Sequence, residues 1–147
     1  MRPRGRVGIA VAALLVCSGG GIAQGETRIS RDAVAAMFKA ARSNPRTKWS
    51  IDGKCVWGYF FVDHDRQKLE RAGQLLQGDG YRLVEVRGPQ RMQAGLRFIL
   101  HVQKVEQHSV DSLLARNDRH YAFARKQGLE HYDGMDVGPL PNGKCET

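Results

Sequence analysis

The sequence is short of cysteine and has no long hydrophobic run. Its 147 residues include three cysteines, too few for the disulfide framework that replaces a core in very small proteins. No apolar stretch approaches the roughly 20 residues that a membrane-spanning helix needs. Apolar residues make up 41% and charged residues 26% of the chain, which excludes a disordered or fibrous protein. The length therefore predicts one small globular domain.

The sequence also lacks the short motifs of common catalytic and cofactor sites. It contains no zinc-type HExxH or CxxC spacing, no Gly-x-Ser-x-Gly turn and no phosphate-holding glycine loop before a helix. Helix-end positions and opposite strand faces are expected for the five histidines, His64, His101, His108, His120 and His131. We therefore predict no enzyme activity, no cofactor and no metal. The alternative is an extracytoplasmic histidine-dependent hydrolase or nuclease, which needs two histidines and an acid in one concave pocket.

The first 23 residues have the pattern of a secretory signal peptide. Three arginines precede an apolar stretch at residues 7–16, and small residues follow up to Ala23. We expect cleavage after Ala23 and export to the periplasm or the medium. Removal of the three arginines lowers the net charge from +8 to +5. Cys17 leaves a lipid anchor open, although Val16 is larger than the residue that usually precedes a lipidated cysteine.

Export would leave two cysteines in an oxidising compartment, Cys55 and Cys145. We predict a disulfide between them, which would join the C-terminal tail to the first strand of the domain. Closing a loop of about 90 residues stabilises the folded state by roughly 4 kcal/mol on loop-entropy grounds. Two free thiols are the alternative.

Hydrophobic spacing predicts an α+β fold after the signal peptide. We expect a leader at residues 24–53 with one helix, and a domain at residues 54–147 with the order β-α-β-β-α-β. This is the order of a ferredoxin-like sandwich, in which two helices cover one face of a four-stranded sheet. The expected elements are a leader helix at 30–44, strands at 55–62, 81–86, 96–103 and 129–132, a loop at 87–95, and helices that begin at Asp63 or Asp65 and at Ser109 and end near Gly78 and Gly128.

Several short stretches between residues 55 and 139 form a recognisable pattern. They are Tyr59-Phe60-Phe61, Leu69-Glu70, Gly80-Tyr81, Val105-Glu106, the segment 108–113, Asn117 and the segment 130–139. Together they resemble the regulator of ribonuclease E activity B (RraB-like) family of ribonuclease inhibitors. That resemblance implies a ferredoxin-like fold and a non-catalytic, regulatory role in which the chain binds a protein.

The most specific part of this pattern follows the last expected strand. We predict a partner-binding loop there, made of Tyr132, Asp133, Gly134, Met135 and Asp136. An Asp-Gly pair is typical of a turn, and methionine adapts to varied partner surfaces. The alternative is that Met135 is buried under the loop, at a position where the family often has tryptophan.

The expected partner is a protein that the sequence does not identify. Basic residues are spread along the chain instead of being clustered, so a nucleic acid is not favoured, and neither is a small molecule. A nucleic-acid-binding sheet is a second alternative, and it would need Tyr59 or Phe61 exposed beside arginines. We expect both aromatic side chains in the core.

Overall fold

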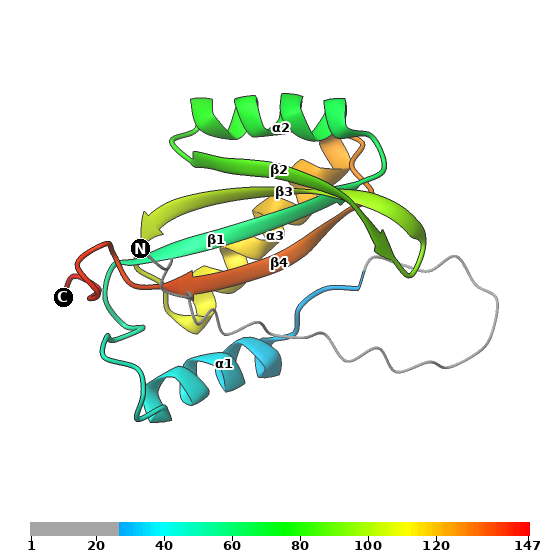
Figure 1. The fold of residues 1–147 in the computed structure, drawn as a ribbon. Coiled ribbons are helices and arrows are strands. Elements are labelled where there is room, and N and C mark those ends of the chain that lie inside the picture. Colours follow the sequence, from blue (N-terminus) through cyan, green and yellow to red (C-terminus); the bar gives the residue numbers. More distant parts are fainter. Residues whose placement is uncertain (1–26) are drawn as a thin grey trace.

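The computed structural model describes residues 27–147, so the predicted signal peptide and Cys17 lie outside the described residues. The described chain forms a four-stranded antiparallel sheet with helices on one face (Figure 1). No helix in this part of the chain is long and apolar enough to span a membrane. The elements are α1 (Arg31–Ser43), β1 (Cys55–Asp63), α2 (Arg66–Gly78), β2 (Arg82–Met92), β3 (Gly95–Glu106), α3 (Val110–Lys126) and β4 (His131–Gly138).

The strand order of the sheet is β2-β3-β1-β4. With the chain order β-α-β-β-α-β, this is the ferredoxin-like arrangement, and the expected α+β fold is confirmed. Each helix begins at a residue whose side chain accepts backbone N–H bonds. Ser30 caps α1, Asp65 caps α2, and Ser109 forms a capping box with Ser112 at the start of α3.

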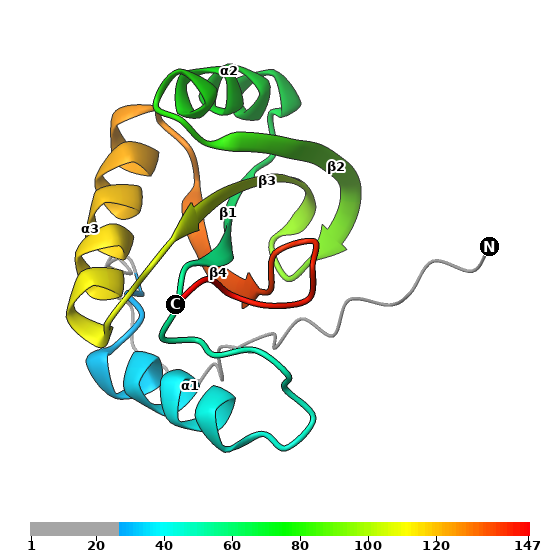
Figure 2. The same ribbon diagram turned by 90° about the vertical axis from the view of Figure 1, so that its left-hand side faces the viewer.

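The core lies between the sheet and the helices. Figure 2 shows α2 and α3 over the sheet and α1 beside one end of α3. Trp57, Tyr59 and Phe61 alternate along β1 and are fully buried beneath the helices. Phe38 of α1 reaches the same core, with its ring 6.1 Å from that of Trp57. Burial of Tyr59 and Phe61 confirms their expected place and removes the exposed aromatics that a nucleic-acid-binding sheet requires.

The prediction of a loop at residues 87–95 is wrong. The two strands β2 and β3 continue through most of this segment and are joined by a tight hairpin turn. Met92 pairs with Gly95 across the hairpin, and the register shifts between Arg87 and Gln90. This bulge accommodates Gly88, whose φ is +119°, and Pro89, which has no backbone N–H to donate. A strand with such a pair is tolerated at the edge of a sheet, where β2 lies.

A disulfide joins Cys55 at the start of β1 to Cys145 in the C-terminal tail, as predicted, with the Cα atoms 4.7 Å apart. The backbones of Lys54 and Glu146 exchange two hydrogen bonds beside it, at 2.6 and 3.0 Å. Gly53 permits this close approach, because a Cβ atom there would lie 2.4 Å from the Glu146 carbonyl oxygen. The tail is therefore held to the sheet by covalent and hydrogen-bonded contacts.

We predict that a Cys55→Ala/Cys145→Ala variant loses roughly 4 kcal/mol of unfolding free energy, because its unfolded chain is no longer closed into a loop. Denaturant unfolding measures this loss. A reductant should destabilise the unmodified protein to a similar extent and leave the double variant unchanged. Thiol labelling of both cysteines in denatured, unreduced protein would contradict the bridge.

Candidate functional site

A partly buried carboxylate, Glu106 at the end of β3, organises the end of the sheet beneath α3. Its Oε2 accepts a hydrogen bond from the Tyr59 hydroxyl at 2.8 Å and lies 3.0 Å from His108 Nε2. Arg116 of α3 donates to both carboxylate oxygens. Ser112 Oγ lies 3.0 Å from the other ring nitrogen of His108. These bonds join β1, β3 and α3 at one point.

The surroundings of Glu106 determine its charge state. Burial alone would raise the pKa of this carboxyl group, but hydrogen bonds from His108, Tyr59 and Arg116 lower it to about 2. Burial and the nearby carboxylate raise the pKa of Tyr59 far above its ordinary value. At neutral pH the cluster therefore holds an ionised Glu106 paired with Arg116 and a protonated Tyr59.

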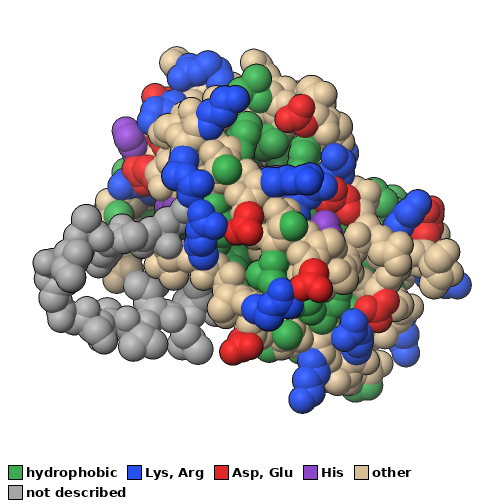
Figure 3. Space-filling model, turned by 180° about the vertical axis from the view of Figure 1, so that it is seen from behind, with side chains coloured by type: hydrophobic (Ala, Val, Ile, Leu, Met, Phe, Trp, Pro, Cys, Tyr) green, Lys and Arg blue, Asp and Glu red, His purple; other side chains and the backbone are tan. Residues whose placement is uncertain are grey.

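Arg116 also lines a pocket of about 320 Å³ between the C-terminal end of α2 and the outer side of α3. The pocket is lined by Leu76, Asp79, Tyr81, Lys104, Arg116, Arg119, His120 and Phe123. Three of these side chains are cationic and one is acidic. Figure 3 views the molecule from the α3 side and shows lysine and arginine side chains across this face, with acidic and apolar side chains among them. An anionic group is the ligand that such a lining attracts.

The three cationic side chains of the pocket differ in whether a carboxylate neutralises their charge. Arg116 is paired with Glu106. Lys104 Nζ donates to the Asp79 carbonyl oxygen at 3.3 Å and lies 4.6 Å from the centre of the Tyr81 ring. Within residues 27–147, neither Lys104 nor Arg119 forms an ion pair with a carboxylate. Two positive charges in the lining are therefore available to a ligand.

His120 is a buried part of the pocket wall, although the sequence predicted a position at the surface or at a helix end. Its side chain is 2% exposed and packs against Tyr59 and Tyr132, with ring centres 4.4 and 5.1 Å away. Burial, together with the charge of Arg116, lowers the pKa of His120 to about 3. Its Nε2 atom has no hydrogen-bond partner among the described residues. His120 is therefore a neutral, aromatic part of the core at neutral pH.

The remaining histidines lie apart from this pocket. His64 and His131 are partly exposed and lie beside carboxylates, Glu130 and Asp133 respectively. His101 stacks on Phe60 on the opposite face of the sheet, with ring centres 4.4 Å apart. The hydrolase alternative requires two histidines and an acid in one pocket, but His120 is the one histidine among the residues that line this pocket. No group of three or more metal-ligating side chains is assembled within residues 27–147.

The prediction that residues 132–136 form a loop is also wrong, because this segment belongs to β4. The sheet register passes from Phe60 opposite Gly134 to Phe61 opposite Tyr132. The Asp-Gly pair is therefore a bulge within the strand instead of a turn. Asp133 is the extra residue of this bulge.

The side chains of this segment serve mainly the core. Tyr132 is 3% and Met135 7% exposed, and the Tyr132 hydroxyl donates to Asn117 Oδ1 of α3 at 2.8 Å. Asp136 lies on the other face of the sheet, over Gly58, where a Cβ would be 2.1 Å from its Oδ1. Asp133 alone among the five is exposed. Partner binding by this segment stays a prediction.

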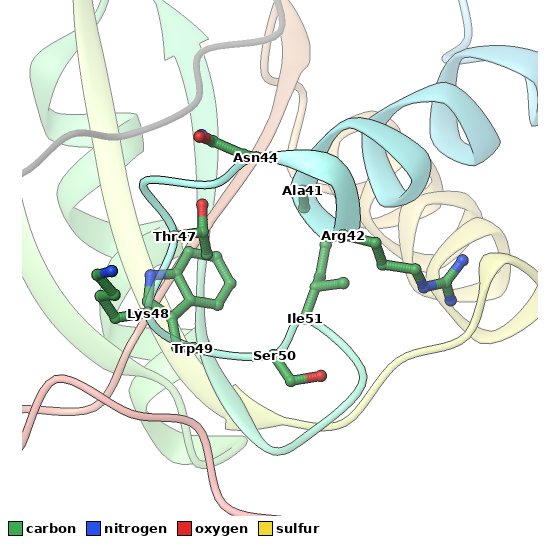
Figure 4. Close-up of a pocket in the computed structure, with 8 residues that line it drawn as sticks. All are labelled: Ala41, Arg42, Asn44, Thr47, Lys48, Trp49, Ser50 and Ile51. Carbon is green, nitrogen blue, oxygen red and sulfur yellow. The ribbon is translucent and has the colours of Figure 1, made fainter.

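A second pocket, of about 390 Å³, lies in the loop that follows α1 (Figure 4). Thr47 and Trp49 lie close together on this loop, while Arg42 points away from them. Arg42 is instead paired with the Asp52 carboxylate, to which it donates two hydrogen bonds of 2.6 and 3.0 Å. This pocket therefore has a mixed lining and less available charge than the pocket beside α3.

Sequence reasoning missed the pocket beside α3, although part of its signal was present. Arg116, Arg119 and His120 are three and four residues apart, so helical spacing places them on one side of α3. Tyr81 lies just before β2, and Lys104 lies in β3. No local pattern indicates that these segments would meet.

The comparisons with known proteins point to one family. The family model described as Regulator of ribonuclease activity B matches residues 49–137. The match extends from before β1 into β4 and includes all the residues that line the pocket beside α3. No curated protein matches the chain.

We predict that Met135→Asp lowers the melting temperature by about 10 °C, because it places an unpaired charge in the core at a cost of about 3 kcal/mol. Thermal unfolding followed by circular dichroism measures this change. Met135→Leu conserves the buried volume and should have a small effect, and so should Asp133→Asn at an exposed position. An unchanged melting temperature for Met135→Asp would mean that this side chain reaches solvent.

We predict that acid destabilises the protein through His120. Its pKa is about 3 in the fold against an ordinary 6.5, so between these values the unfolded chain binds one more proton than the folded chain. The unfolding free energy should fall by roughly 2–3 kcal/mol from pH 6.5 to 4.5 for this reason. Below 4.5 the loss of the Glu106 charge should add to the fall.

The measurement is denaturant unfolding of the protein and of a His120→Phe variant across this pH range. The variant keeps an aromatic ring and removes the titrating group, so its slope should be much smaller. His131→Gln changes an exposed histidine and should keep the original slope. Equal slopes for the protein and the His120→Phe variant would contradict the prediction.

Proposed function

The chain belongs to the regulator of ribonuclease activity B family, and we propose that it is an exported, non-catalytic regulator that acts by binding a protein partner outside the cytosol. The family's description is of a regulator, which implies a protein whose activity is changed by contact. An exported chain would meet its partner in the periplasm or the medium. The partner is therefore a protein of that compartment.

The observation that carries this proposal is the disulfide between Cys55 and Cys145. Cytosolic thiols are kept reduced, whereas disulfides form and persist outside the cytosol. This bridge joins two segments that also exchange backbone hydrogen bonds, so it is an integral part of the fold. The basic, apolar and small-residue order of residues 1–23 supports the same location.

Export is tested on protein recovered from the producing cell. We expect protein in the extracytoplasmic fraction that begins at Gln24, with Cys55 joined to Cys145. A Cys17→Ser variant separates the two routes, since an ordinary signal peptide is processed normally without this cysteine and a lipoprotein signal is not. Intact Met1 on cytosolic protein would refute export.

The binding role is tested by cross-linking in intact cells, followed by mass spectrometry of the adducts. We expect one recurrent extracytoplasmic protein joined to the folded chain. The control is the same chain, reduced and unfolded, cross-linked in an envelope extract beside the folded chain, and it should lose that adduct. Adducts that are equally frequent with the unfolded chain would show non-specific contact and would contradict a specific partner.

A further inference from the structure

We propose that the pocket between α2 and α3 recognises a carboxylate side chain on an acidic, partly apolar segment of the partner protein. This inference rests on the proposed function and names the chemistry by which the partner is recognised. Its basis is the juxtaposition of Lys104, Arg119 and the Tyr81 hydroxyl in one pocket of about 320 Å³.

The first argument is the supply of donors. Lys104 and Arg119 have no carboxylate partner within the described residues, and both line the pocket. Tyr81 is 7% exposed, and burial raises its pKa to about 12, so its hydroxyl keeps its proton at neutral pH. The lining thus presents two cationic groups and a hydroxyl, which are the groups that form charge-assisted hydrogen bonds with a carboxylate.

The second argument is that the fold holds the pocket wall in place. Arg116 cannot turn away freely, because it is bonded to both oxygens of the partly buried Glu106. Its charge is compensated there, yet its guanidinium still lies 5.9 Å from the Tyr81 ring. Lys104 Nζ also lies over this ring, 4.6 Å from the ring centre. A rigid wall reduces the entropy that binding must overcome.

The third argument concerns the acid within the lining. Asp79 caps the C-terminal end of α2 and lines the same pocket. Glu106 offsets the charge of Arg116, and Asp79 offsets one of the two remaining cations, so the pocket keeps a net charge of about +1. Such a balance favours a group of single negative charge over a densely charged polymer.

The fourth argument is the apolar surface beside the charges. Leu76 and Phe123 line the pocket, and Leu75, the residue before Leu76 on α2, is 49% exposed. A protein segment that carries an acidic and an apolar side chain can satisfy both kinds of surface. A nucleic acid needs a continuous basic track, and on α3 an acidic residue, Asp118, lies between Arg116 and Arg119.

The test uses protein purified from the producing cell and three fluorescent probes. The first probe is a 12-residue peptide of alternating glutamate and leucine pairs, the second replaces glutamate by glutamine, and the third is a single-stranded RNA of 12 nucleotides. Fluorescence anisotropy measures affinity. Amide chemical shifts in NMR spectra locate the binding site. We expect the glutamate peptide to bind most tightly and to shift the amides of Tyr81, Lys104 and Arg119.

The decisive variant is Lys104→Gln/Arg119→Gln, which should weaken binding of the glutamate peptide by about tenfold. The matched control is Lys39→Gln/Arg91→Gln, which also removes two exposed charges but lies on α1 and at the hairpin end of β2. Equal weakening by both variants would overturn the proposal. So would shifts located elsewhere, or tighter binding of the RNA to the pocket.

The outcome is distinguishable from failure of the proposed function. If the recurrent adduct of the exported protein persists in cells with the Lys104→Gln/Arg119→Gln variant, the regulator binds its partner through another surface and only the pocket proposal fails. If neither export nor a recurrent adduct is found, the proposed function itself fails. Both altered side chains lack carboxylate partners, so the variant should keep the melting temperature of the original protein within a few degrees.

Discussion

The ion pair between Glu106 and Arg116 is the interaction on which the rest of this domain depends. A carboxylate taken out of water without a partner costs several kcal/mol, so Glu106 requires all of its bonds to Tyr59, His108 and Arg116. These bonds set the distance of α3 from the sheet at this end. They also hold Arg116 where it lines the pocket beside α3. The ion pair between Glu106 and Arg116 thereby fixes part of the wall of this pocket.

The disulfide imposes a second constraint at the same end of β1, where Cys55 is paired with Glu106 across the β1–β3 register. It brings the C-terminal tail to the start of the sheet, where Gly53 leaves room for the Glu146 backbone. A reducing compartment would remove this constraint, so the stability of the fold is linked to its location. This coupling agrees with an exported regulator. The sheet face opposite the helices carries a different set of groups, with His101 stacked on Phe60.

Sequence patterns misled at two places for the same reason. The Gly88-Pro89 pair and the Asp133-Gly134 pair are both typical of turns, and both lie instead in bulges of edge strands. A bulge uses the same backbone freedom as a turn but keeps the strand paired on either side. Local composition does not distinguish the two, because the difference lies in whether a neighbouring strand continues beyond the pair. Here β3 continues beyond one pair and β1 beyond the other.

The sequence by itself determined the order of the elements, their helix caps and the family. These follow from short-range spacing, such as that of Ser30 or Ser109 before an apolar stripe. The even pair of cysteines after the predicted signal peptide also predicted the disulfide. Only the tertiary structure decided that His120 is buried and that Tyr81, Lys104 and Arg119 line one pocket. That outcome depends on how α3 packs against β4 and α1 and on the bonds from Arg116 to Glu106 of β3. The summed burial of side chains far apart in the chain sets this packing, and no local pattern does.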